Sequence, residues 1–193
     1  MPEREVSPVP DDELVRRHCR GDAAAFEALF RRYEGTVERI VAHVGGSPEA
    51  VEDLCQETFL RIHRNLRSFR FGSSVKTWIC RVAVNVAIDF ARQFKARPVA
   101  EAEPDWDRVP SDALSPEDQA ARAELQALVQ QRIAELNPKL RATLVLREIH
   151  GMTYSEIASV MGCRVRSVET RLRRARQQLL ARLGNWLSQD HDG

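Results

Sequence analysis

Residues 153–180 carry the pattern in this sequence that points most directly to a chemical task. Thr153 and Glu156 have the spacing of a capping box, in which each side chain binds a backbone amide at the start of a helix. Gly162 stands where the end of that helix needs a left-handed residue, and a second helix follows after a short turn. This order predicts a helix-turn-helix, a motif that places its second helix in the major groove of DNA.

The second helix of this motif has an apolar face and a basic face. At about 100° per residue, its apolar side chains repeat at intervals of three and four. They predict a buried face made of Val165, Val168, Leu172, Ala175 and Leu179. The opposite face carries Arg166, Ser167, Thr170, Arg173 and Arg174. Arginine binds guanine and phosphate, and hydroxyl side chains reach base edges, so we interpret this face as DNA-binding. A basic helix that packs against a partner protein is the alternative.

The charges of the chain are segregated, although its net charge is only +1. Residues 61–97 hold nine basic residues against one acidic, and residues 164–182 hold seven against one. Acidic residues outnumber basic ones by thirteen to seven in residues 1–60 and by seven to one in residues 98–118. Two basic blocks separated by an acidic one indicate two surfaces that bind polyanions. Ordinary solvated helix faces are the alternative explanation.

The elements that must position these blocks are all predicted to be helices. Asp22 is a plausible N-cap for a periodic apolar stretch that ends at Gly45-Gly46. Ser47-Pro48-Glu49 predicts the start of the next helix, and a loop at 69–74 precedes a third helix that starts near Val75. Asn137-Pro138 starts a further helix before the helix-turn-helix. Residues 97–115 hold three prolines and little periodic hydrophobicity, which is typical of a linker.

These patterns predict an all-α fold made of two small helical domains. The first comprises residues 11–96 and the second residues 116–184, and an acidic flexible linker at 97–115 joins them. The helix-turn-helix lies in the second domain.

Several other classes of protein are excluded or disfavoured by the composition. The acidic and histidine residues form no paired carboxylates, triad or metal set, and there is no P-loop, so we expect neither an enzyme nor a cofactor. The sequence contains no run of about 18 apolar residues, which a transmembrane helix would need. Its N-terminus also lacks the apolar core of a signal peptide. We therefore expect a cytoplasmic protein without membrane insertion. The four cysteines are expected to be buried thiols, and only the adjacent His18 and Cys19 merit a test for metal or redox sensing.

Four segments in order resemble the extracytoplasmic-function (ECF) class of bacterial sigma factors. These segments are DDELVRRHCRGDAAAFEALFRRY, EDLCQETFLRIHRNLRSF, VKTWICRVAVNVAIDFAR and LNPKLRATLVLREIHGMTYSEIASVMGCRVRSVETRLRRARQQL. Together the resemblance covers residues 11–95 and 116–183. It implies sigma region 2 and sigma region 4, joined by a linker, in an alternative sigma factor that binds core RNA polymerase and directs initiation at promoters.

The resemblance also implies roles for individual residues. Binding to the clamp helices of the largest polymerase subunit falls to Asp53, Leu54, Gln56, Glu57 and Phe59. Recognition of the −10 element falls to Phe69, Arg70, Phe71, Ser73, Ser74, Lys76, Arg81 and Asn85. Recognition of the −35 element as duplex falls to Arg164, Arg166, Ser167, Thr170, Arg171, Arg173 and Arg174. The polymerase flap and an anti-sigma factor are further implied partners.

Two other functions share part of this sequence pattern. A one-component helix-turn-helix transcription regulator would show the same C-terminal motif, and would bind its operator as a homodimer without polymerase. A helical adaptor would bind proteins with no dependence on DNA. Binding to core polymerase distinguishes the sigma factor from both.

Overall fold

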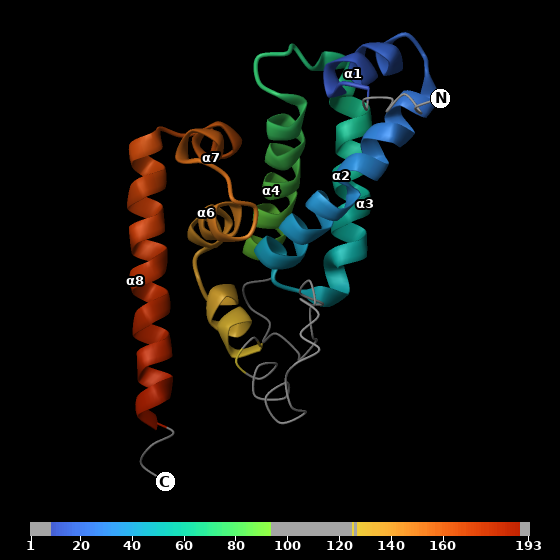
Figure 1. Ribbon diagram of the computed structural model, residues 1–193. Coiled ribbons are helices and arrows are strands. Elements are labelled where there is room, and N and C mark those ends of the chain that lie inside the picture. Colours follow the sequence, from blue (N-terminus) through green and yellow to red (C-terminus); the bar gives the residue numbers. More distant parts are fainter. Residues whose placement is uncertain (1–8, 94–124, 126, 190–193) are drawn as a thin grey trace, which may run out of the picture.

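The structure is a computed structural model that describes residues 9–93, 125 and 127–189. Every regular element in this part of the chain is a helix (Figure 1), which confirms the predicted all-α class. The predicted linker, residues 97–115, and the helix start predicted at Ser115-Pro116 lie outside the described residues.

The N-terminal part, residues 9–93, is built around one long central helix. Its elements in order are α1 (Asp11–Cys19), α2 (Ala23–Gly45), the 3-10 turn η1 (Pro48–Ala50), α3 (Val51–Asn65), the 3-10 turn η2 (Leu66–Ser68) and α4 (Val75–Gln93). Helix α2 contacts α1, α3 and α4. Its apolar side chains recur at helical spacing, and Val37, Ile40 and Val41 are fully buried. This stripe therefore holds the N-terminal helices together.

Both ends of α2 are fixed by residues that the sequence singled out. The Asp22 carboxylate accepts a hydrogen bond from the backbone N–H of Ala24 at 3.0 Å and pairs with Arg17 at 2.7 Å. Gly46 ends the helix in the left-handed conformation, with φ of 76°. The helix start predicted at Ser47-Pro48 is a single 3-10 turn, and α3 itself begins at Val51.

The C-terminal part contains the predicted helix-turn-helix. A helical segment at 127–134 precedes α6 (Pro138–Glu148), α7 (Tyr154–Met161) and α8 (Val165–Gln189). Asn137 caps α6 by accepting from the backbone N–H of Lys139 at 3.1 Å. The capping box is confirmed, because Glu156 N–H donates to Thr153 Oγ1 at 3.3 Å and Thr153 N–H donates to the Glu156 carboxylate at 2.8 Å. Gly162 follows α7 with φ of 59°, as the turn requires.

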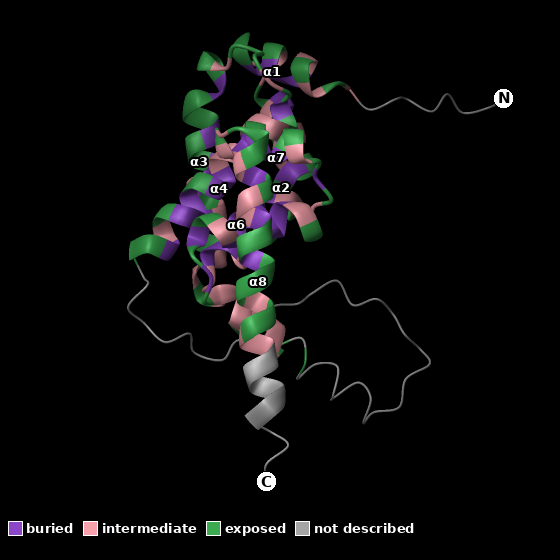
Figure 2. Ribbon diagram, turned by 90° about the vertical axis from the view of Figure 1, so that its left-hand side faces the viewer, coloured by how far each residue is buried: buried purple, intermediate pink, exposed green. Residues whose placement is uncertain are grey.

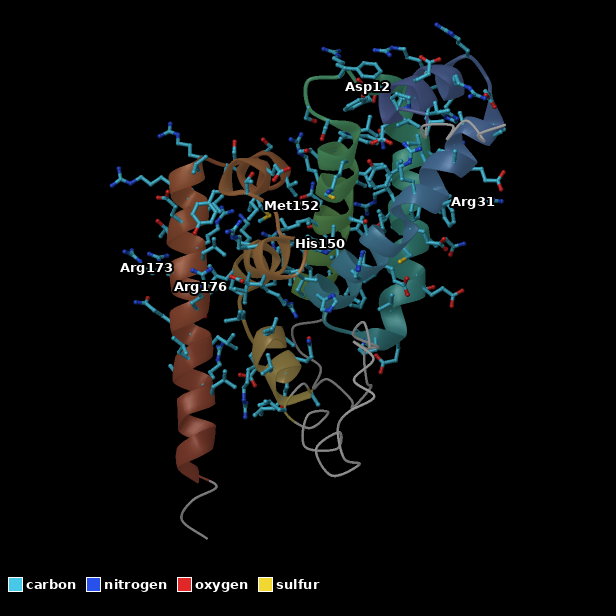
Figure 3. The ribbon with its side chains drawn as sticks, in the orientation of Figure 1. Asp12, Arg31, His150, Met152, Arg173 and Arg176 are labelled. Atoms are coloured by element: carbon cyan, nitrogen blue, oxygen red, sulfur yellow. The ribbon has the colours of Figure 1, made fainter. Side chains whose placement is uncertain are left out.

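The two parts of the chain pack against each other. Helices α2 and α4 contact α6, and α4 also contacts α7 (Figure 1). The buried apolar residues of both parts form one continuous cluster. Figure 3 shows His150 and Met152 on the side of the C-terminal helices that faces α4. The sequence predicted two helical units, but it held no signal that they would share a core.

An arginine is buried in this interface between the two parts. Arg141 of α6 is only 4% exposed, and its Nε has no hydrogen-bond partner among the described residues. Its guanidinium lies against the end of α2, where a Cβ added at Gly46 would stand 2.3 Å from Nη1. Burial lowers the pKa of Arg141 to about 10. No described residue forms an ion pair with Arg141, and a buried cation without a counter-charge destabilises the packing that surrounds it.

Basic groups from both parts also approach each other near His150. Burial lowers the pKa of this imidazole to about 4, and Arg39, His43 and Lys76 of the N-terminal part lower it further by repulsion. A neutral imidazole is therefore favoured in the packed state. Apolar burial therefore holds the two parts together, and a protonated His150 would oppose the contact.

Replacing Arg141 by methionine should stabilise the protein. Methionine fills a similar volume without burying a charge, so we expect the free energy of unfolding to rise by about 1 kcal/mol and Tm to rise by roughly 2–4 °C. Thermal and urea unfolding followed by circular dichroism measure both quantities. Lys139→Met on the exposed face of the same helix is the matched control, with a change within about 0.5 kcal/mol. A lower stability of Arg141→Met would show that the guanidinium makes compensating contacts.

Candidate nucleic-acid interface

Helix α8 exposes most of the arginines that were predicted to contact duplex DNA. Val168, Leu172 and Ala175 are buried, as the apolar face predicted, while Leu179 is half-buried. Val165 is 42% exposed, so its predicted burial is wrong. It is the first residue of α8, ahead of the turns that pack on α6 and α7. Figure 2 shows exposed residues along the side of α8 that faces away from those helices.

Some of the residues predicted to read the −35 element are exposed, and others contact neighbouring residues of the chain. Arg164, Arg166, Arg173 and Arg174 are exposed. Ser167 and Thr170 are half-buried, and the Thr170 hydroxyl donates to the Arg166 carbonyl at 3.0 Å. Arg171 reaches back to the turn, where Nη1 lies 3.5 Å from Cys163 Sγ. Arg173 points away from the body, whereas Arg176 turns toward α6 and pairs with Glu148 at 2.7 Å (Figure 3).

The loop between η2 and α4 presents aromatic side chains at the surface. Phe71 is 41% exposed and has φ of 54°, a left-handed conformation that a bulky side chain rarely adopts. Its ring lies 4.9 Å from that of half-buried Phe69, which in turn packs 5.4 Å from Trp78. Trp78 is partly buried and packs against the core. The loop therefore holds one aromatic ring outward and anchors it with two more.

The polar residues of this loop have different structural roles. Arg70 and Lys76 are exposed, and Ser73 is half-buried. Ser74 caps α4, because its hydroxyl accepts from the backbone N–H of Thr77 at 3.1 Å. Capping occupies one acceptor site of Ser74, so this side chain positions the start of α4.

Helix α4 carries the remaining residues predicted for the −10 element. Asn85 is exposed on its polar stripe. Arg81 faces the C-terminal part, and its Nη2 donates to the carbonyl of Ser159 in α7 at 2.6 Å. In the packed state Arg81 is thus held by α7, while Asn85 is accessible.

The predicted polymerase-binding set on α3 is split between the surface and the core. Asp53 and Gln56 are exposed, and Glu57 pairs with Arg61 at 2.6 Å. Leu54 and Phe59 are only 6% and 8% exposed, so they pack in the core instead of facing a partner. The Phe59 ring, for example, lies 4.4 Å from that of Phe30.

An apolar residue that the sequence analysis passed over lies on the exposed side of α3. Leu60 is 43% exposed. It follows Gln56 by one helical turn and Asp53 by two, so the three share one face. The sequence signal that could have indicated this exposed position was its spacing of four residues from Gln56. Leu60 is therefore an exposed apolar side chain on the same face as Asp53 and Gln56.

The His18 and Cys19 pair does not form a metal site in the structure. His18 is 7% exposed and packs between Phe26 and His63, with ring centroids 5.4 Å and 5.2 Å away. Burial and the charge of His63 lower its pKa. Cys19 is exposed, so its expected burial is wrong, and among the described residues it forms no disulfide. Within the described ranges, no three histidine, cysteine or acidic side chains gather in a way that would hold a metal ion. Nor is any described helix long and apolar enough to cross a membrane.

Comparisons with known proteins match this arrangement. Residues 29–97 match the family described as Sigma-70 region 2, and residues 126–179 match Sigma-70, region 4. The chain is 34% identical to the RNA polymerase sigma-H factor of Pseudomonas aeruginosa, over 88% of this chain and 91% of that protein. It is 33% identical to the ECF RNA polymerase sigma-E factor of Haemophilus influenzae, over 88% of this chain and 93% of that protein.

Two solved structures have a similar fold. CnrH, solved in complex with the cytosolic domain of CnrY, is 30% identical with a TM-score of 0.67, over 91% of this chain and 97% of that one. The sigma factor RpoE of Bartonella quintana, solved with the anti-sigma factor NepR, is 20% identical with a TM-score of 0.59. This match covers 82% of this chain and 96% of that chain.

Two arginines of α8 provide a matched test of this surface. Arg173→Ala should weaken binding to promoter duplex and reduce the slope of log K against log salt by about one, because one phosphate contact is lost. Arg176→Ala removes the same charge from the same helix, but this arginine is already paired with Glu148, so we expect a smaller loss. Fluorescence anisotropy with polymerase holoenzyme across a salt series measures both. Equal losses for the two variants would contradict the assignment.

Proposed function

Because this chain belongs to the ECF class of bacterial RNA polymerase sigma factors, we propose a specific division of labour between its two parts. The family consists of transcription initiation factors that bind core polymerase and promoter DNA, and the polymerase supplies the chemistry. In this proposal residues 11–96 bind core polymerase and the −10 element, and residues 116–184 bind the −35 element. In this proposal the chain and the polymerase act together in the cytoplasm, where transcription takes place.

The observation that carries this proposal is the difference between the two exposed surfaces. Helix α8 presents a regular face of arginines, which suits the major groove of an intact duplex. The loop at 69–74 presents an exposed aromatic ring beside basic and hydroxyl side chains. Aromatic rings bind bases that have left the stack, as bases must when the −10 element melts. One surface fits double-stranded DNA and the other fits a single strand.

The proposal requires the two parts of the chain to separate. Arg81 is hydrogen-bonded to Ser159 of α7 in the packed state and cannot contact the −10 element there. The −10 and −35 elements are, by their names, about 25 base pairs apart, which is roughly 85 Å along B-form DNA. Two parts of the chain that are in direct contact cannot span this distance. We therefore propose that the packed state is inactive in promoter recognition. A partner that binds the packed state would act as an anti-sigma factor.

The face of α3 formed by Asp53, Gln56 and Leu60 is our proposed contact with the clamp helices of polymerase. Exposed acidic and amide groups pair with a basic surface, and Leu60 adds an apolar contact. The flap of the polymerase is the proposed contact of the C-terminal part. In this proposed polymerase contact the apolar residue is Leu60, because Leu54 and Phe59 are buried.

In vitro transcription tests the proposed function. Core polymerase supplied with this chain should bind it and should initiate at discrete sites on a library of genomic DNA fragments, mapped by the 5′ ends of the transcripts. Core polymerase alone provides the background. A chain that fails to bind core and yields no start sites above that background would overturn the proposal.

A variant of Leu60 tests the assigned polymerase surface. Leu60→Ser should weaken core binding by about tenfold, because an apolar side chain of this size contributes roughly 1.5–3 kcal/mol when fully buried. Its effect on Tm should be small, since Leu60 is 43% exposed in the free protein. Leu54→Ala is the contrasting variant and should lower Tm, because Leu54 lies in the core. Unchanged core affinity for Leu60→Ser would exclude this face.

A further inference from the structure

Arg16 of α1 lies directly on the exposed aromatic ring of the loop at 69–74. Its guanidinium carbon is 4.9 Å from the centroid of Phe71, within the range of a cation–π contact. None of the roles that the family resemblance implies involves Arg16, which is separated from the loop by α2, α3 and η2. The fold brings the two together at one end of the N-terminal part, where α1 and the loop lie side by side (Figure 1).

Helix α1 is held firmly enough to fix the place of Arg16. Leu14 and Val15 are buried in the core at 2% and 1% exposure. Asp11 at the start of the helix accepts hydrogen bonds from the Tyr33 hydroxyl and from Arg32, both in α2. Arg16 is therefore presented by an anchored helix.

The guanidinium of Arg16 keeps hydrogen-bonding capacity for a ligand. Its side chain is 50% exposed, and its carboxylate neighbour Glu13 is 4.0 Å away, at the limit of an ion pair. A guanidinium can stack its plane on an aromatic ring while its N–H groups point outward and bind phosphate. Because half of the Arg16 side chain is exposed, the contact with Phe71 leaves it accessible to a ligand.

The strained backbone of Phe71 explains why such support is useful. A left-handed phenylalanine persists only when its surroundings hold it in place. Phe69 supports the ring from within the loop at 4.9 Å, and Arg16 supports it from outside the loop. The two contacts fix the orientation of the one exposed aromatic ring of the loop.

We infer that Arg16 is a further residue of the single-strand interface, which positions Phe71 and binds a phosphate of the strand whose base meets that ring. This inference rests on the proposed function, because it requires a melted −10 element. It extends the interface from the loop and α4 to α1. A planar cation beside an aromatic ring is a combination that binds single-stranded nucleic acid with little dependence on sequence.

The test compares Arg16→Ala, Arg16→Lys and the control Arg20→Ala in reconstituted holoenzyme. Arg20 is exposed at the end of the same helix, with no contact to Phe71. The probe is a single-stranded oligonucleotide that carries the non-template −10 strand of a promoter mapped by in vitro transcription. Its affinity is measured across a salt series, and core binding and Tm are measured in parallel.

Arg16→Ala should lower affinity for this strand by about five- to tenfold and reduce the salt slope by about one. Arg16→Lys should restore the slope, because it keeps the charge, and should recover only part of the affinity. In a Phe71→Ala background, Arg16→Ala should lower the affinity for the strand by less than it does in the wild-type background. It should still reduce the salt slope by about one. Arg20→Ala should change neither quantity.

Two results would overturn the inference. One is an effect of Arg16→Ala no larger than that of Arg20→Ala, and the other is a loss of Tm or core binding that accounts for the whole effect. Both are distinguishable from failure of the proposed function, in which the wild-type holoenzyme would neither form nor bind the strand.

Discussion

The contact between the two parts of the chain combines apolar burial with the cost of burying basic groups, and the stability of the packed state depends on this balance. Among the described residues the Nε of buried Arg141 has no hydrogen-bond partner, and burial together with Arg39, His43 and Lys76 lowers the pKa of His150. The continuous apolar cluster outweighs these costs in the packed state. Our proposal requires polymerase and promoter DNA to replace this contact, which they do only if they bind the separated state more tightly than the packed one.

Each of the two exposed surfaces is also anchored by contacts within its own part of the chain. The helix-turn-helix is fixed by the Thr153 capping box and by the left-handed Gly162, which set the start of α8. The aromatic loop is fixed by Ser74 at the start of α4 and by the packing of Phe69 on Trp78. Each surface is therefore preorganised within its own part. Separation of the two parts would leave both surfaces intact.

Much of the fold could be predicted because its signals are local. Caps at Asp22, Asn137 and Thr153 depend on side chains within three residues of the helix start, and all three are confirmed. The burial of Val168, Leu172 and Ala175 follows from helical periodicity alone. Similarity to known sigma factors over most of the chain then distinguishes the sigma factor from a one-component regulator and from an adaptor.

The rest depends on packing that spacing does not reveal. Helix α3 contacts both α2 and α4, so its apolar residues split between a core face with Leu54 and Phe59 and an exposed face with Leu60. Leucine occurs on both faces, and only the positions of the neighbouring helices decide between them. The left-handed Phe71 and its contact with Arg16 join residues far apart in sequence. The packing of Arg81 against α7 likewise has no local signal.

The distance between the two parts tests most directly whether they separate when the protein binds polymerase and promoter DNA. Fluorescent labels introduced at the exposed positions Arg64 of α3 and Gln178 of α8 would report it by single-molecule energy transfer. The account predicts high transfer efficiency in the free protein and a loss of transfer in the holoenzyme bound to promoter DNA, where the two elements lie roughly 85 Å apart. High efficiency that persists in the transcribing complex would contradict it.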